Sequence, residues 1–102
     1  MIKLALFARL EAKPGKEADV AAFLEAGLAM ARAETTTPIW FALRLSPTTF
    51  GVFDAFHNED GRQRHLSGPI AQALMEKAPE LFASPPTIDK IEVLGLKNDG
   101  SA

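Results

Sequence analysis

The sequence contains no cysteine and no tyrosine, and its 102 residues include only two histidines and one tryptophan. Without cysteine the chain can form no disulfide and no thiolate metal site, and it has no cysteine nucleophile. A metal would depend mainly on carboxylates, so we expect neither a structural nor a catalytic zinc. A glycine-rich phosphate loop, a catalytic triad and paired-carboxylate spacing are also lacking, so we expect no bound cofactor.

The chain also lacks an excess of charge of either sign and a long hydrophobic run. It has 11 basic and 13 acidic residues and a net charge of -2, so neither nucleic acid nor an anionic membrane is an expected partner. No apolar run approaches the roughly 20 residues of a membrane-spanning helix. Arg9 and Glu11 interrupt the apolar start and no cleavage site follows, so we expect no signal peptide and a cytoplasmic location.

Hydrophobic periodicity predicts strands and helices in the order βαββαβ. The predicted elements are a strand over residues 2–11, a helix over 16–33, strands over 39–45 and 50–56, a helix beginning at residue 69 and a strand over 87–96. The two middle strands are expected to form a hairpin. We expect a single domain over residues 1–97 and a flexible tail over residues 98–102.

The second predicted helix has a sharp beginning. Pro69 suits a first helical turn because its φ is fixed and it has no N–H to lose, and Ser67 or Gly68 can cap that turn. Upstream, Asn58 can cap a short helical segment. Downstream, Pro79 removes a helical N–H, so we expect it to end or break the helix.

These elements predict an α+β, ferredoxin-like sandwich, in which a four-stranded antiparallel sheet carries its helices on one face. The uncovered face would still present Ala5 and Phe7 from the first strand. In the second strand, either the set that contains Phe41 or the set that contains Trp40 would extend this apolar surface. Such a patch is usually an interface, so we expect a homodimer in which two sheets pack face to face.

The predicted hairpin ends in an acidic-x-aromatic step, Asp54-Ala55-Phe56, and after a polar turn His65, Leu66 and Pro69 form a His-Leu-x-x-Pro step that opens a helix. With the βαββαβ order of the elements, these features resemble the antibiotic biosynthesis monooxygenase family over about residues 2–96. The resemblance implies a dimeric α/β barrel. It also implies oxygenation of a phenolic or quinol-like aromatic substrate, without flavin, haem or metal, in a pocket between the sheet and the helices.

In this resemblance His65 matches the pocket histidine. An imidazole with the ordinary pKa of about 6.5 can remove a phenolic proton, and the resulting anion can pass an electron to oxygen. The alternative is that His65 only braces the start of a helix or bonds a backbone carbonyl.

The chain departs from the family in two respects. It has no tyrosine hydroxyl to hold the substrate's oxygens, which leaves Trp40 as an indole donor. The haem-degrading branch of the fold carries an Asn in the first strand and a Trp and a His around the second helix. The matching positions here are Ala8, His65 and Met75, so we do not expect haem degradation.

Four other side chains are predicted to contact the substrate, namely Trp40, Asp54, Phe23 and Leu74. Trp40 either lines the pocket or anchors the dimer interface, and we favour the interface because large aromatic side chains are enriched there. Asp54 either orients the His65 imidazole or pairs with Arg44 across the hairpin, and we favour the cross-strand pair.

The inward faces of the helices are predicted to carry five core residues, Phe23, Leu24, Leu28, Leu74 and Met75. The sequence does not distinguish those that also form pocket wall from those that only pack in the core. With the resemblance, the sequence predicts a cofactor-independent monooxygenase in which His65 is the catalytic base. The alternative is a non-catalytic or stress-related dimer that binds a small apolar ligand in the same pocket.

Overall fold

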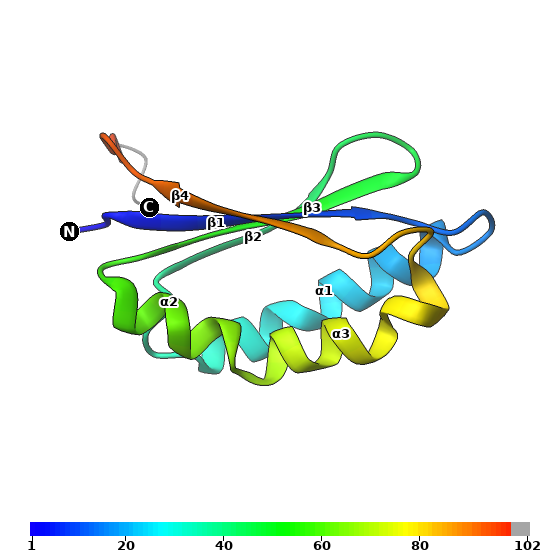
Figure 1. Ribbon diagram of the computed structural model, residues 1–102, viewed down its shortest axis with the longest axis horizontal. Coiled ribbons are helices and arrows are strands. Elements are labelled where there is room, and N and C mark those ends of the chain that lie inside the picture. Colours follow the sequence, from blue (N-terminus) through cyan, green and yellow to red (C-terminus); the bar gives the residue numbers. More distant parts are fainter. Residues whose placement is uncertain (99–102) are drawn as a thin grey trace.

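The computed structural model describes residues 1–98, in which a four-stranded sheet carries the helices on one face (Figure 1). In chain order the elements are β1 (Leu4–Glu11), α1 (Glu17–Ala33), β2 (Ile39–Arg44), β3 (Thr49–Phe56), α2 (Glu59–Leu66), α3 (Pro69–Leu81) and β4 (Thr87–Glu92). The strand order is β2-β3-β1-β4 and each neighbouring pair is antiparallel. The predicted α+β ferredoxin-like fold is confirmed. Of the tail predicted over residues 98–102, all but Asn98 lies outside the described residues.

Alternation along β1 divides the sheet into a helix-facing side and an open side. Ala8 and Leu10 belong to the core cluster that the sheet forms with α1 and α3. Phe7 points the other way and lies in register with Phe53 of β3. Phe53 is in turn in register with Phe41 of β2. These three aromatic side chains form a row across the sheet, which we call the open-face row.

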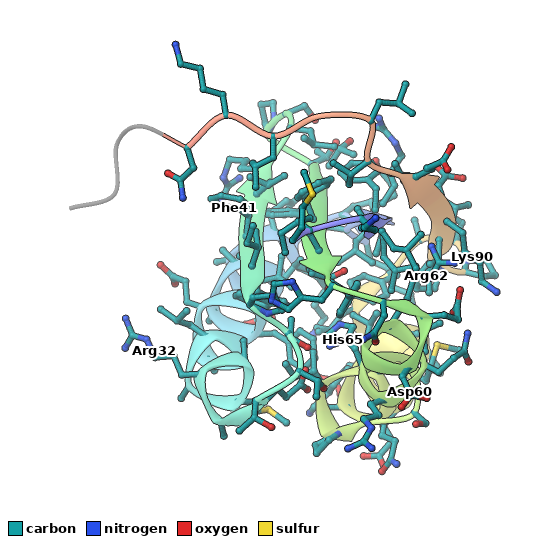
Figure 2. The ribbon with its side chains drawn as sticks, turned by 90° about the vertical axis from the view of Figure 1, so that its left-hand side faces the viewer. Arg32, Phe41, Asp60, Arg62, His65 and Lys90 are labelled. Carbon is teal, nitrogen blue, oxygen red and sulfur yellow. The ribbon has the colours of Figure 1, made fainter. Side chains whose placement is uncertain are left out.

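The open-face row decides which side of β2 faces the helices. The ring centroids of Phe41 and Phe53 lie 6.3 Å apart, and Phe41 is 54% exposed. Figure 2 shows Phe41 on the strand, away from the helices. The set of β2 residues that contains Trp40 therefore faces the helical layer.

The helix α1 packs on the sheet through positions spaced three and four apart. Its buried residues are Val20, Leu24, Gly27 and Ala31. Two residues predicted to face inward do not, since Leu28 is 40% exposed and Met75 of α3 is 60% exposed. Each follows a buried residue by one position and so points about 100° away around its helix.

The helix α3 begins as predicted but ends later. Gly68 is its N-cap and Pro69 lies in the first turn. The prediction that Pro79 ends the helix is wrong, because α3 continues to Leu81. Continuation buries Leu81 and Phe82. Burying such side chains contributes about 1.5–3 kcal/mol each. Together they match or exceed the roughly 3 kcal/mol that a proline costs in a helix interior.

The last strand is shorter than predicted, since β4 ends at Glu92 instead of residue 96. Glu92 is in register with Leu4, the first residue of β1, so the ladder runs out of partner strand there. Val93 adds one more backbone hydrogen bond, 2.8 Å long, to the carbonyl of Lys3. Among the helices of residues 1–98, none has the length and apolar character needed to cross a membrane.

Candidate functional site

A cavity of about 110 Å³ lies between the sheet and the helices. Its lining residues are Leu6, Ala8, Trp40, Val52, Asp54 and Ile88 from the sheet and Phe23, Leu24, Ala26, Gly27, Met30, His65, Leu66, Ile70, Ala71, Ala73 and Leu74 from the helices. The five side chains predicted for the site all lie in this wall. Trp40, for which the dimer interface was the favoured prediction, lines this cavity instead. Only three of these lining side chains, Trp40, Asp54 and His65, carry hydrogen-bonding groups.

The imidazole of His65 lies between two carboxylates. Its Nε2 is 2.7 Å from Oδ2 of Asp54, and its Nδ1 is 2.7 Å from Oε1 of Glu34. The exposed fractions of the side chains are 8% for His65, 3% for Asp54 and 15% for Glu34. We call these three residues the His65 cluster, and Figure 2 shows His65 between the sheet and the helical layer. Each ring nitrogen thus has an anionic acceptor, an arrangement that suits a doubly protonated imidazolium.

Asp54 reaches the His65 cluster because side chains alternate along β3. It is in register with Leu6 of β1 and Trp40 of β2, which also line the cavity. The favoured prediction, a cross-strand pair of Asp54 with Arg44, is wrong. The hairpin register places Arg44 opposite Phe50, and its guanidinium lies 4.5 Å from the centroid of that ring. Asp54 pairs with Trp40 at the other end of the hairpin, beyond the reach of Arg44.

The helix ends supply the other two members of the cluster. His65 lies in the last turn of α2, whose first turn is capped by Asn58, since Asn58 Oδ1 accepts a 2.9 Å hydrogen bond from the Gly61 N–H. Glu34 is the C-cap residue of α1 and also accepts a 2.8 Å hydrogen bond from the Thr37 hydroxyl.

Glu34 was not among the predicted site residues. A carboxylate at the C-terminal end of a helix opposes the helix dipole, so it is unfavourable there unless it has another partner. This placement is the one signal in the sequence that could have drawn attention to Glu34.

The cluster shifts the pKa values of two of its members. Burial alone would lower the pKa of the His65 imidazole, but the hydrogen bonds and negative charges of Asp54 and Glu34 outweigh it and raise that pKa above its ordinary value. Burial raises the pKa of the Asp54 carboxyl, and the charge of Glu34 adds to this effect, while His65 opposes it. His65 therefore keeps its proton to a higher pH than a free imidazole, and Asp54 is more basic than an ordinary carboxylate.

Three buried polar atoms around the cavity lack a hydrogen-bond partner among residues 1–98. They are Oδ1 of Asp54, Nε1 of Trp40 and Oε2 of Glu34. An unsatisfied buried polar group costs about 1–3 kcal/mol, so such atoms often mark places where a ligand or water completes the bonding. Asp54 and Trp40 line the cavity, and these two atoms are an acceptor and a donor that have almost no accessible surface of their own.

The close approach of α1 sets the position of the Trp40 indole. A Cβ at Gly27 would lie 3.4 Å from both Cη2 and Cζ2 of Trp40. The ring therefore packs against the helix backbone where Gly27 has no side chain.

Within the part of the chain that the structure describes, no group of three or more His, Cys, Asp or Glu side chains is placed to hold a metal ion. The groups that the cavity offers for chemistry are the carboxylate of Asp54, the imidazolium of His65 behind it and the indole N–H of Trp40. Such a set can accept a proton and hold an oxygen atom of a small ligand.

No protein-family model and no curated protein matches the chain. Among solved structures, the NE2512 protein of unknown function from Nitrosomonas europaea is 59% identical and has a TM-score of 0.94, with 96% of this chain and 95% of that chain covered. This likeness in sequence and structure runs through nearly the whole of both chains.

More distant structures carry a more specific name. A candidate antibiotic biosynthesis monooxygenase from Deinococcus radiodurans is 18% identical with a TM-score of 0.80, and 93% of this chain and 96% of that chain are covered. Another, from Nitrosomonas europaea, is 13% identical with a TM-score of 0.80, and 90% of each chain is covered. At this level of identity the likeness shows the fold, and function has to be argued from the site.

Proposed function

Since the chain belongs to the family of the NE2512 protein and has the fold of the antibiotic biosynthesis monooxygenases, we propose that it is a cofactor-independent monooxygenase acting on a phenolic or quinol-like aromatic substrate. The observation that carries the proposal is Oδ1 of Asp54. It is a buried carboxylate oxygen in the wall of a mostly apolar cavity, without a hydrogen-bond partner in residues 1–98. A general base in a dry cavity is what oxygenation without a cofactor requires.

Asp54 is better placed than His65 to take the substrate's proton. Both nitrogens of His65 lie 2.7 Å from carboxylate oxygens, so the charged ring has no lone pair for a substrate. Asp54 contacts His65 through Oδ2, which leaves Oδ1 as a proton acceptor. Burial raises the pKa of the Asp54 carboxyl and so brings it closer to neutral pH, where a general base is most effective. In this assignment His65 is a positioning residue that orients Asp54.

The reaction then needs only the phenol and oxygen. Asp54 accepts the phenolic proton, and the phenolate passes one electron to O₂. The substrate radical and superoxide form a carbon–oxygen bond at a ring carbon, and Asp54 returns its proton to the distal oxygen of the peroxide. The ring carbon loses its hydrogen as a proton while the O–O bond breaks, and that proton joins the departing hydroxide as water. One oxygen atom enters the quinone product, the other leaves as water, and the substrate supplies all four electrons.

Oxygen consumption by the native protein and by Asp54→Asn tests this proposal. With a panel of hydroquinones and naphthols, we expect the native protein to consume one O₂ per quinone formed, without accumulation of hydrogen peroxide. Loss of the general base should lower kcat/KM by about 10²–10⁴. Binding without oxygen consumption by the native protein would support the alternative function, a non-catalytic ligand-binding protein.

We also propose that the chain forms a homodimer through the open face of the sheet. The open-face row of Phe7, Phe41 and Phe53 supports this, because it places three large apolar side chains on a face that the helices do not cover. A contiguous apolar patch of this kind on a small protein is typical of a protein interface.

A further inference from the structure

We propose that the cavity binds a single-ring aromatic molecule with one un-ionised hydroxyl group, which accepts a hydrogen bond from Nε1 of Trp40 and donates one to Oδ1 of Asp54. This inference rests on the proposed function for the substrate class. It narrows that class to ligands of a stated size, charge and polar group. Its evidence is the pairing of these two side chains, the volume of the cavity and the charges behind its wall.

The pairing of Trp40 with Asp54 provides the polar contact. The two residues are directly opposite each other on β2 and β3, on the face that lines the cavity. Side chains in such a pair begin about 4.5–5.5 Å apart at their Cβ atoms. Within residues 1–98, neither the indole N–H of Trp40 nor Oδ1 of Asp54 has a hydrogen-bond partner. A hydroxyl oxygen between them can accept from the first and donate to the second at once.

The volume of the cavity limits the size of the ligand. The cavity measures about 110 Å³. A cavity of about 150 Å³ lined by apolar side chains binds benzene, so a volume of this order is sufficient for one ring and small for a fused polycyclic system. Around the polar pair the wall is apolar, with Phe23 and Leu74 among its members. These surfaces suit the faces of an aromatic ring.

The charges behind the wall select an un-ionised ligand. Asp54 and Glu34 lie on either side of one imidazole, so negative charge is in excess when the cluster is ionised. A carboxylate ligand would meet Asp54 Oδ1 as a like charge in a low-dielectric site, which is strongly unfavourable. A neutral hydroxyl brings its own proton and satisfies Oδ1 without this penalty. The ligand's proton is thus also the one that Asp54 takes in the proposed reaction.

Fluorescence of Trp40 provides a direct test, because this residue is the only tryptophan and the chain has no tyrosine. We would titrate the native protein, without oxygen, with phenol, anisole, benzoate and 2-naphthol. Phenol should give a saturable change in the emission. Anisole, which cannot donate to Asp54, should bind at least about tenfold more weakly. Benzoate should not bind, and 2-naphthol should bind more weakly than phenol.

Three results would overturn the inference. Equal binding of anisole and phenol would show that the hydroxyl makes no donor contact. Tighter binding of 2-naphthol than of phenol would contradict the limit to one ring, and binding of benzoate would contradict the charge argument. Because the native protein is compared with itself, no outcome depends on whether a variant folds.

The inference and the proposed function can fail separately. If phenol binds in the expected order but none of the hydroquinones and phenols consumes oxygen, the ligand class stands and the monooxygenase proposal fails. If a naphthol supports oxygen consumption while phenol does not bind, the monooxygenase proposal stands and the ligand class fails.

Discussion

Replacing Gly27 with alanine should stabilise the protein, because the structure leaves room for one more carbon where glycine is unfavourable. Alanine is favoured over glycine in a helix interior by roughly 0.5–1 kcal/mol. The new Cβ would lie 3.4 Å from Cη2 and Cζ2 of Trp40, which is ordinary van der Waals contact. We therefore expect the free energy of unfolding to rise by roughly 0.5–1 kcal/mol.

The same substitution at Gly61 is a matched control with the opposite sign. Gly61 also lies in a helix, α2, but a Cβ there would be 2.9 Å from the backbone carbonyl oxygen of Thr36. A backbone atom cannot rotate away as a side chain can, so α2 or the neighbouring connection must shift. Such overpacking typically costs about 1–3 kcal/mol, which exceeds the gain in helix propensity. We expect Gly61→Ala to lower the free energy of unfolding.

Urea unfolding followed by far-ultraviolet circular dichroism would measure both changes, at one protein concentration because association would add to the apparent stability. A change of 1 kcal/mol corresponds to about 4–8 °C in Tm for a chain of this size. Destabilisation by Gly27→Ala would refute the described packing of the indole on α1. An unchanged or raised stability for Gly61→Ala would refute the close approach of Thr36.

Three further predictions concern pH and assembly. If Asp54 is the base and charged His65 its partner, the rate should rise with pH through the raised pKa of Asp54 and fall as the pH passes the raised pKa of His65. If His65 is the base, the rate should instead rise through the pKa of His65 and then reach a plateau. The raised folded-state pKa of His65 means that protonated His65 stabilises the fold, and this contribution is complete below about pH 6.5. As the pH rises through the folded pKa, the contribution is lost, and the free energy of unfolding falls by up to about 1.4 kcal/mol per pH unit. Urea midpoints from about pH 6 to about pH 9 should fall accordingly, and His65→Gln should remove this fall; a fall of equal size in the variant would assign it to another group. Light scattering should give about twice the chain mass of 11.0 kDa for the native protein and for the exposed control Met75→Asp, but a monomer for Phe7→Asp. A native monomer would exclude the proposed interface.

The sequence alone predicts most helices and strands because the hydrophobic periodicity that marks them is a local property of the chain. The helix predicted over residues 16–33 is observed as Glu17–Ala33, and the strand predicted over residues 2–11 as Leu4–Glu11. The predictions of element ends fail where contacts between distant parts of the chain determine the structure. Pro79 does not end α3 because residues beyond it are needed in the core, and β4 ends where β1 has no more residues to pair with.

The candidate site was predictable in part for the same reason. His65 and Asp54 stand in local patterns that resemble a known family, so both were found. Their contact depends on which face of the hairpin meets the helices, and an apolar residue at every position from Ile39 to Leu43 left that choice open. Glu34 lies 31 positions before His65 and belongs to no pattern with it, so only the fold, which brings the C-cap of α1 to the last turn of α2, reveals their hydrogen bond.

Phe53 of the open-face row and Asp54 of the cavity are consecutive residues of β3. Because successive side chains of a strand point to opposite faces, inserting or deleting one residue within β3 would exchange the two surfaces over the rest of the strand. Such a change would turn an aromatic ring toward the cavity and a carboxylate toward the open face, damaging both in a single step. An insertion in the loop of residues 45–48 would leave β3 aligned with β1 and spare both surfaces. The length of β3 is therefore under stronger constraint than the length of the loop that precedes it, whatever residues occupy either.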